Sequence, residues 1–271
     1  MIALRRCLPL FLCVFALAGC SGDGIKPGAR GLFDLIAPPT PAEAVEMATN
    51  RWDADQRYRG TQLLSNAPFA GEAVYLALFR DNANDKDPGV RAASIRALGL
   101  HGGVEDVPLL LTRLKDEDPG VRTEAARSLQ RIHSPDAVSP LLDALDPAKE
   151  GEGQVRVEAA SALGQYPQSR VVEALIAAMG DEKLAINAAV QDSLRTLTGQ
   201  DFGVDQAAWQ TWYKQNPGLF DARAAYIYPV FRRPRRWWEY LPFVPPPPNE
   251  VAAMPVGVNP NDIGAEPSDK K

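Results

Sequence analysis

The sequence predicts an all-α protein built from about five stacked helix pairs. The first observation behind this prediction is an internal repeat in the middle of the chain, with copies 31 and 34 residues apart. The second is the helical spacing of the apolar residues inside each copy. The third is the composition: 45% of the 271 residues are hydrophobic, which is enough for a repeat array with a substantial core.

Three copies of the repeat align closely. They begin at Val90, Val121 and Val155, and each continues with Arg, a run rich in small residues, and a Leu eight positions after the Val. Weaker copies begin at Gln56 and Ile186. Apolar residues at i, i+4 and i+8 lie on one face of a helix, so we expect the aligned segment to be the second helix of each pair.

Start signals precede these helices. Asp87-Pro88 and Asp118-Pro119 each place a capping carboxylate before a proline at the first helical position. The stretch from Thr40 to Glu43 has the form of a capping box and predicts the start of the first helix. The first helix of a pair is indicated by apolar residues upstream, for example Val107, Leu110, Leu111 and Leu114.

The pattern acid-Pro-Gly-Val-Arg-x-x-Ala-Ala-x-x-Leu resembles the HEAT repeats of the phycobilisome-lyase-like group, over residues 41 to about 199. The resemblance implies a right-handed α-solenoid in which loop acids and helix arginines form an ion-pair ladder. Carried over residue by residue, the ladder would pair Asp53 with Arg57, Asp87 with Arg91, Asp118 with Arg122, and Glu152 with Arg156. The fifth unit has Lys183 and Asn187 instead, so we expect the ladder to stop there. We favour this structural role over anion binding by the arginines.

An aromatic helix is expected to close the array. Asp205 can cap it, and Trp209 and Trp212 lie three residues apart, on the same helical face. The segment resembles the Leu-Thr-Gly…Phe-Gly-x-Asp…Trp-x-x-Trp closure of other bacterial HEAT-type proteins. A terminal repeat must cover its open apolar face, so we interpret the aromatics as a lid rather than a ligand box.

The composition changes at residue 217. The segment 217–271 holds 11 of the 24 prolines, which predicts an extended or disordered tail. Within it, possible partner-binding residues interleave arginines and tryptophans: Arg232, Arg233, Arg235, Arg236, Trp237 and Trp238. Docking on a partner and packing of the aromatics on the chain's own array both stay open. An anionic membrane surface is a further possible target for these residues.

The N-terminus has the three-part pattern of a secretory signal: Arg5 and Arg6, an apolar stretch over 8–17, and a small-residue site before Cys20. Leu-Ala-Gly-Cys resembles the lipobox of bacterial lipoproteins, which implies lipid attachment at Cys20. Ser21 then favours the outer membrane, with the protein facing the periplasm. The other interpretation is an ordinary cleaved signal or an uncleaved anchor in which Cys20 is incidental.

These signals divide the chain into five segments. We expect a signal peptide at 1–19, a linker at 20–40, HEAT-like repeats at 41–199, a cap helix at 200–216 and a Pro-rich tail at 217–271.

Signals of catalysis are scarce, and we predict no catalytic residue, no metal and no cofactor. His101 and His133 fall near the ends of two aligned helices, where a histidine can cap the last carbonyls. No His-x-x-x-His or Glu-x-x-His spacing is present. Deoxyhypusine hydroxylase, a HEAT-type enzyme, binds iron through His-Glu dipeptides, but Gly102 and Ser134 follow the two histidines here.

We therefore expect a lipid-anchored cell-envelope scaffold that binds a protein partner, and not an enzyme. The formal net charge of −5 and the pI near 5.2 argue against nucleic-acid binding, which needs a basic face. One alternative is a HEAT-type enzyme resembling a phycobilin lyase or deoxyhypusine hydroxylase. The other is a structural envelope protein that contacts the membrane through its Arg/Trp tail.

Overall fold

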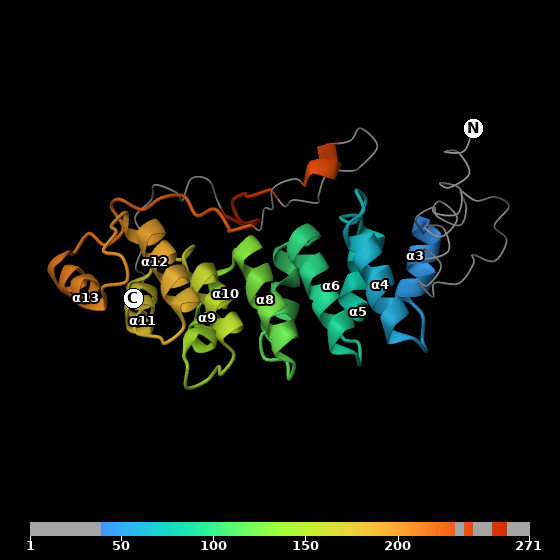
Figure 1. Ribbon diagram of the computed structural model, residues 1–271, viewed down its shortest axis with the longest axis horizontal. Helices are drawn as coiled ribbons and strands as arrows, with labels where there is room; N and C mark the ends of the chain where they lie inside the picture. The colour runs from blue at the N-terminus through green and yellow to red at the C-terminus, as the bar shows by residue number, and fades with distance from the viewer. Residues whose placement is uncertain (1–38, 231–235, 241–250, 259–271) are drawn as a thin grey trace, which may run out of the picture. The chain divides into compact units, whose positions relative to one another are not determined.

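The computed structural model describes residues 39–230, 236–240 and 251–258. The chain divides into units of residues 1–40 and 41–271, and the fold below is that of the second unit. Every regular element in the described residues is a helix (Figure 1). In this part of the chain, no helix has the length and apolar character that a membrane span requires. Cys20, the predicted signal peptide and nearly all of the predicted linker lie outside the described residues.

Ten helices form five consecutive pairs within the described residues. The first helices of the pairs are α3 (Pro41–Ala48), α5 (Ala73–Asn82), α7 (Val107–Arg113), α9 (Val138–Leu145) and α11 (Ser169–Ala178). The second helices are α4 (Ala54–Ser65), α6 (Pro88–His101), α8 (Pro119–Arg131), α10 (Gly153–Leu163) and α12 (Leu184–Thr198). Short 3₁₀ turns, η1 (Val104–Asp106) and η2 (Pro135–Ala137), lead into α7 and α9.

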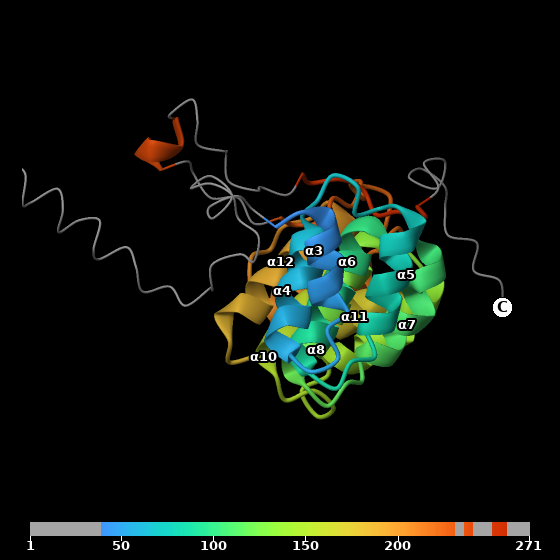
Figure 2. The ribbon, with the colours of Figure 1, turned by 90° about the vertical axis from the view of Figure 1, so that its right-hand side faces the viewer.

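The pairs stack side by side in chain order. Viewed along the stack, α4, α10 and α12 lie on one side and α5 and α7 on the other (Figure 2). Each second helix packs against the second helix of the next unit, from α4 through α12. The predicted all-α solenoid of helix pairs is confirmed.

The repeated apolar positions of the sequence form the core. The first position of the pattern is fully buried in four units, at Val90, Val121, Val155 and Ile186, as is the Leu eight residues later, at Leu98, Leu129, Leu163 and Leu194. Burying each such side chain contributes about 1.5–3 kcal/mol. One cluster of buried residues extends from Ala83 in the second unit to Trp209 beyond the fifth, so neighbouring units complete one another's cores.

Capping carboxylates start the second helices. Asp53, Asp87 and Asp118 accept hydrogen bonds from the backbone N–H three residues on, at 3.0–3.1 Å. Asp87 and Asp118 precede a proline at the first helical position, whose fixed φ suits that place. Glu152 caps α10 through the Gln154 N–H. Each such cap stabilises its helix by about 1 kcal/mol.

Close contact between second helices requires small residues at the crossing points. A Cβ at Gly99 of α6 would lie 2.2 Å from Ser128 Oγ of α8, so only glycine fits there. Ser128 Oγ donates to the Ile95 carbonyl at 3.0 Å, which bonds the two helices directly. Gly164 and Ser193 repeat the arrangement two units later, where Ser193 Oγ donates to a carbonyl of α10 at 2.8 Å.

An ion-pair ladder joins the loops of neighbouring units. Its four rungs are Arg57–Asp85 at 2.6 Å, Arg91–Asp116 at 2.7 Å, Arg122–Glu150 at 2.7 Å and Arg156–Asp181 at 3.1 Å. The acids differ from those expected, because Asp53, Asp87, Asp118 and Glu152 accept backbone N–H groups as helix caps. The acid of each rung comes from the next unit and lies two residues before that unit's cap.

The Arg91 rung shows how a buried ion pair is satisfied. Arg91 Nε and Nη2 donate to the two oxygens of Asp116 at 3.0 and 2.7 Å, and Nη1 donates to the carbonyls of Asp85 and Lys86. Asp116 also accepts the Asp118 N–H. The side chains of Arg91 and Asp116 are only 7% and 3% exposed. Bidentate geometry and the extra hydrogen bonds offset the cost of removing both charges from water.

The ladder changes at the fifth unit, where Asn187 occupies the position of the arginines. Asn187 Nδ2 donates to the Asp181 carbonyl at 3.0 Å, so it keeps the contact with its own loop. Its short side chain has no guanidinium to offer a further acid. Among the described residues, the last rung is therefore Arg156–Asp181.

We predict that Asp116→Asn destabilises the fold by roughly 3 kcal/mol at about pH 7, because the buried Arg91 charge loses its partner. Burial opposes ionisation of Asp116, but hydrogen bonds from Arg91, the Asp118 N–H and Arg113 outweigh it and lower the pKa of this carboxyl. A carboxyl whose pKa is lower in the folded state than in the unfolded state stabilises the fold at pH values above its unfolded-state pKa. This stability is lost as the pH falls through the folded-state pKa. Urea unfolding should therefore show the difference from wild type shrinking below about pH 4.

The matched control is Asp192→Asn, which changes an exposed carboxylate paired with Arg195. Its expected effect is within about 0.5 kcal/mol. Equal losses from Asp116→Asn and Asp192→Asn would contradict the role of the ladder.

An aromatic helix closes the described array. Asp205 caps α13 (Gln206–Gln215) by accepting the Ala208 N–H, and the Trp209 side chain is fully buried. Trp209 packs edge-on against Phe202 at 4.9 Å between ring centroids and against Trp212 at 6.1 Å, and its Nε1–H donates to the Gly203 carbonyl. Trp209 belongs to the main core cluster, so these residues cover the fifth unit as a lid.

Trp209→Ala should lower the free energy of unfolding by about 3–5 kcal/mol, because it empties a fully buried site. Trp212→Ala, at a half-buried position, should cost clearly less. Chemical denaturation of both variants measures the two losses of unfolding free energy. A larger loss for Trp212→Ala than for Trp209→Ala would contradict the central role of Trp209 in the lid.

Candidate functional site: a groove crossed by the C-terminal segment

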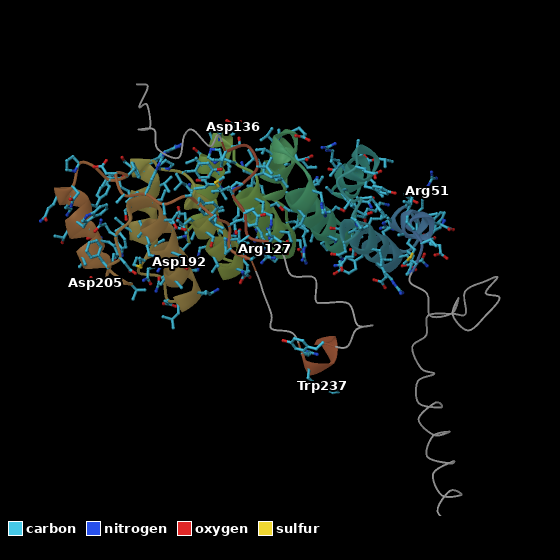
Figure 3. All side chains as sticks on the ribbon, turned by 90° about the horizontal axis from the view of Figure 1, so that it is seen from above. Arg51, Arg127, Asp136, Asp192, Asp205 and Trp237 are labelled. Carbon is cyan, nitrogen blue, oxygen red and sulfur yellow. The ribbon has the colours of Figure 1, made fainter. Side chains whose placement is uncertain are left out.

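The second helices form the floor of a groove. Between α6, α8, α10 and α12 and the segment 226–230 lies a cavity of about 820 Å³. Its charged lining residues are Arg96, Arg127, Arg131, Arg195, Glu158 and Asp192. Figure 3 shows Arg127 and Asp192 on one side of the array and Asp136 of η2 on the other. The groove therefore lies on the side formed by the second helices.

A buried polar network fixes the floor of the groove. Glu158 of α10 accepts hydrogen bonds from Arg127 and Gln130 of α8, both at 2.6 Å, and from Gln154 at 2.8 Å. Three donors, one of them charged, compensate the burial of this carboxylate. Because two donors come from α8, the network holds α8 and α10 in register under the groove.

Glu124 lies at the edge of this network. Burial raises the pKa of its carboxyl, and the neighbouring Arg127 lowers it only in part. Arg127 Nη1 donates to Glu124 Oε1 at 2.6 Å, while Oε2 accepts no hydrogen bond from the described residues. The arginine thus bridges Glu124 on its own helix and Glu158 on the next.

An extended segment of the C-terminal region, residues 224–230, crosses the ends of three second helices in turn. The Ala224 N–H donates to the Thr196 carbonyl of α12 at 2.8 Å. Two residues later, the Tyr226 hydroxyl donates to the Ser161 carbonyl of α10 at 2.8 Å. After two more, the Tyr228 ring lies 5.3 Å from the Arg131 guanidinium of α8. This segment is the orange trace that runs along the stack in Figure 1.

A second segment, residues 251–258, returns to the same place. The Val256 N–H donates to the Arg131 carbonyl at 2.7 Å and the His133 N–H donates to the Val256 carbonyl at 2.8 Å, which forms an isolated parallel bridge. The Tyr228 N–H donates to the Ala253 carbonyl at 3.2 Å, so the two segments are also bonded to each other. We call residues 224–230 and 251–258 together the clasp.

Gly257 lies near the end of the second segment of the clasp, residues 251–258. Its φ of 91° lies in the region that favours glycine. A Cβ there would also lie 2.7 Å from Val104 Cγ1 and 2.9 Å from the His133 carbonyl oxygen. Glycine therefore lets the clasp approach η1 and the end of α8 closely.

The tail residues singled out from the sequence fall, in the chain order, between the two segments of the clasp. Trp237 begins the 3₁₀ turn η3 (Trp237–Tyr240), and its side chain is 77% exposed. Arg236 is exposed as well. Arg232, Arg233, Arg235 and the side chain of Trp238 lie outside the described residues. Two other aromatic residues of the tail, Tyr226 and Tyr228, contact the second helices.

The two histidines bond neighbouring units together. His101 Nε2 lies 2.7 Å from the Ser65 carbonyl at the end of α4, so it caps the preceding second helix rather than its own. His133 Nδ1 lies 2.9 Å from Gln165 Oε1, and its ring stacks on Tyr166 at 4.9 Å. Among the described residues, no three His, Cys, Asp or Glu side chains are placed to hold a metal ion together.

Comparison with protein families gives the class of the repeat. A model of HEAT repeats matches residues 76–153, and a model of the PBS lyase HEAT-like repeat matches residues 155–181. These residues form HEAT repeats. The matches span α5 to α11, so the groove floor from α6 to α10 is part of the HEAT array. The resemblance derived from the Val-Arg-x-x-Ala-Ala pattern is confirmed.

Solved structures with a similar fold include two HEAT-like proteins. YibA of Escherichia coli is 20% identical, with 65% of this chain and 68% of that chain covered and a TM-score of 0.47. The CpcE–CpcF complex of phycocyanin lyase from Nostoc is 21% identical, with 56% and 96% covered and a TM-score of 0.43. No curated protein matches the chain in sequence.

Sequence reasoning missed the clasp because it judged the tail by composition. Prolines are frequent after residue 217, yet the two segments of the clasp lie in stretches without charged residues. One contains Tyr226-Ile227-Tyr228, with the aromatics at alternate positions, and the other runs from 251 to 258. Alternation of this kind indicates an extended segment with one face against a surface, and it was the available signal.

Proposed function

We propose that this HEAT-repeat chain is a scaffold that binds an extended segment of a protein partner in the groove of its second helices, and that a lipid on Cys20 tethers it in the bacterial cell envelope. The single observation that carries the proposal is the clasp, because the chain's own residues 224–230 already lie extended across this groove. A surface that holds one extended segment has the chemistry to hold another.

The chemistry of the groove suits polypeptide. Carbonyl groups in the last turns of helices can accept hydrogen bonds from outside the helix, and the clasp bonds to those of Thr196, Ser161 and Arg131. The Ser161 carbonyl accepts the Tyr226 hydroxyl in addition to the Gly164 N–H. Acceptors of this kind bind N–H and hydroxyl donors of any extended chain. The cavity beside them, at about 820 Å³, falls in the range that ligands occupy in proteins.

Photocrosslinking tests the binding face. A photoreactive side chain at Asp192, in the groove, should capture a discrete partner in the native envelope. The same side chain at Asp136, exposed on the opposite side of the array, is the matched control and should not (Figure 3). Capture of the same partner with equal yield from Asp136 would contradict binding in the groove.

The tether rests on the sequence pattern that ends at Cys20. We expect Cys20→Ala to abolish metabolic labelling with an alkyne fatty acid and to release the protein from the membrane fraction. Cys13→Ala is the control and should be labelled normally, because that residue precedes the expected cleavage site. Unchanged labelling of the Cys20 variant would end the proposal of a lipid anchor while leaving the binding groove untouched.

A further inference from the structure

The clasp makes a different contact with each second helix that it crosses. Residues 224, 226 and 228 meet α12, α10 and α8 in turn, one helix for every second residue. An extended chain places alternate residues on the same side, so residues 224, 226 and 228 can all face the helices. Ile227, between the two tyrosines, is 53% exposed and contributes little to recognition.

Each tyrosine meets a different group. The Tyr226 hydroxyl must donate, because its partner is the Ser161 carbonyl oxygen. Burial raises the pKa of this hydroxyl, which keeps the donor protonated. The Tyr228 ring lies against the Arg131 guanidinium, a cation–π contact that tolerates any electron-rich ring but not an aliphatic side chain. The first position therefore selects tyrosine, and the second selects an aromatic residue.

The clasp covers the groove without filling it. Ala224, Ala225 and Pro229 remain exposed, and the cavity of about 820 Å³ persists between the segment 224–230 and the helices. The segment 224–230 contacts the helices at Thr196, Ser161 and Arg131, and Tyr228 also bonds to residues 251 and 253 of the second segment. A segment that made the same contacts and also filled the cavity would bury more apolar surface than the clasp does.

We propose that residues 224–230 are an intramolecular stand-in for the partner, and that the partner binds through an extended Tyr-x-aromatic segment that displaces them. This inference rests on the proposed function and names the class of its partner. Because residues 224–230 are part of the same chain, their effective concentration at the groove is on the order of millimolar. They therefore exclude weakly binding segments, whereas a tightly binding segment displaces them. The groove thereby rejects segments that lack the two aromatic residues.

The probe for this inference is a fluorescein-labelled peptide with the sequence of residues 222–230, Ala-Arg-Ala-Ala-Tyr-Ile-Tyr-Pro-Val. Fluorescence anisotropy measures its binding to the full chain. We expect weak binding to wild type, where residues 224–230 occupy the groove. The double variant Tyr226→Ala/Tyr228→Ala releases that segment and should bind at least about tenfold more tightly.

Two controls separate recognition from non-specific adhesion. A peptide with alanine at both tyrosine positions should not bind the double variant, and a peptide with phenylalanine at the first position should bind several-fold more weakly, because it lacks the hydroxyl donor. Tyr240→Ala changes an exposed aromatic outside the clasp and should leave peptide binding as in wild type. Equal binding of the alanine peptide would overturn the inference.

Hydrogen exchange on the wild-type chain gives a second readout that needs no destabilising variant. The Ala224 and Val256 N–H groups of the clasp donate to the Thr196 and Arg131 carbonyls of the array, and the Tyr228 N–H donates to the Ala253 carbonyl within the clasp. A saturating excess of peptide should accelerate exchange at Ala224 and Tyr228 while the core of α8 stays protected. Unchanged exchange at saturation would overturn displacement.

The two proposals fail separately. If the peptide fails to bind the double variant while a partner is still captured from Asp192, the groove is functional and only the Tyr-x-aromatic class is wrong. If capture from Asp192 fails as well, the proposed function is wrong too.

Discussion

The bidentate contact between an arginine of one unit and an acid of the next is the interaction on which the array depends. Each guanidinium binds its own loop through Nη1 and, at Arg57, Arg91 and Arg122, the neighbouring acid through Nε and Nη2. One side chain therefore sets both the conformation of a loop and its distance from the next loop. The hydrophobic contacts between helices are less directional and would tolerate sliding, which the ladder prevents.

The specificity that we propose for the groove depends on a fixed spacing between units. The carbonyls of Thr196 and Ser161 and the guanidinium of Arg131 come from the second helices of three successive units, and their separation follows from the stacking of those helices. The network around Glu158 holds α8 and α10 together at the same place. The clasp shows that one extended segment can contact three units at once. The recognition proposed for the groove would therefore depend on the stacking of the repeat.

Much of the fold could be predicted from local patterns. The buried Val and Leu positions, the capping role of Asp205 and the aromatic closure at Trp209 are visible within one unit. The acids that pair with the arginines cannot be identified within one unit, because each ion pair joins two units. The acid nearest to each arginine in sequence is instead bonded to the backbone as a helix cap. An acid stands two residues before the cap in each case, at Asp85, Asp116, Glu150 and Asp181, but only the stacked geometry shows its use. The clasp also could not be predicted from local patterns, because it depends on a few contacts between segments that are far apart in the sequence. Such contacts hardly affect the composition of either segment.

Each arginine of the ladder pairs with an acid of the following unit, and this direction limits how the array can be lengthened. Every internal unit supplies an arginine towards its successor and an acid towards its predecessor, so a tandem duplication of an internal unit would leave all rungs complete. Duplication of the fifth unit would not, because Asn187 offers no guanidinium and the acid of the added copy would be buried without its cation. Gene duplication of an internal unit can therefore lengthen the array, whereas addition of a further unit after the fifth would leave an acid without its arginine.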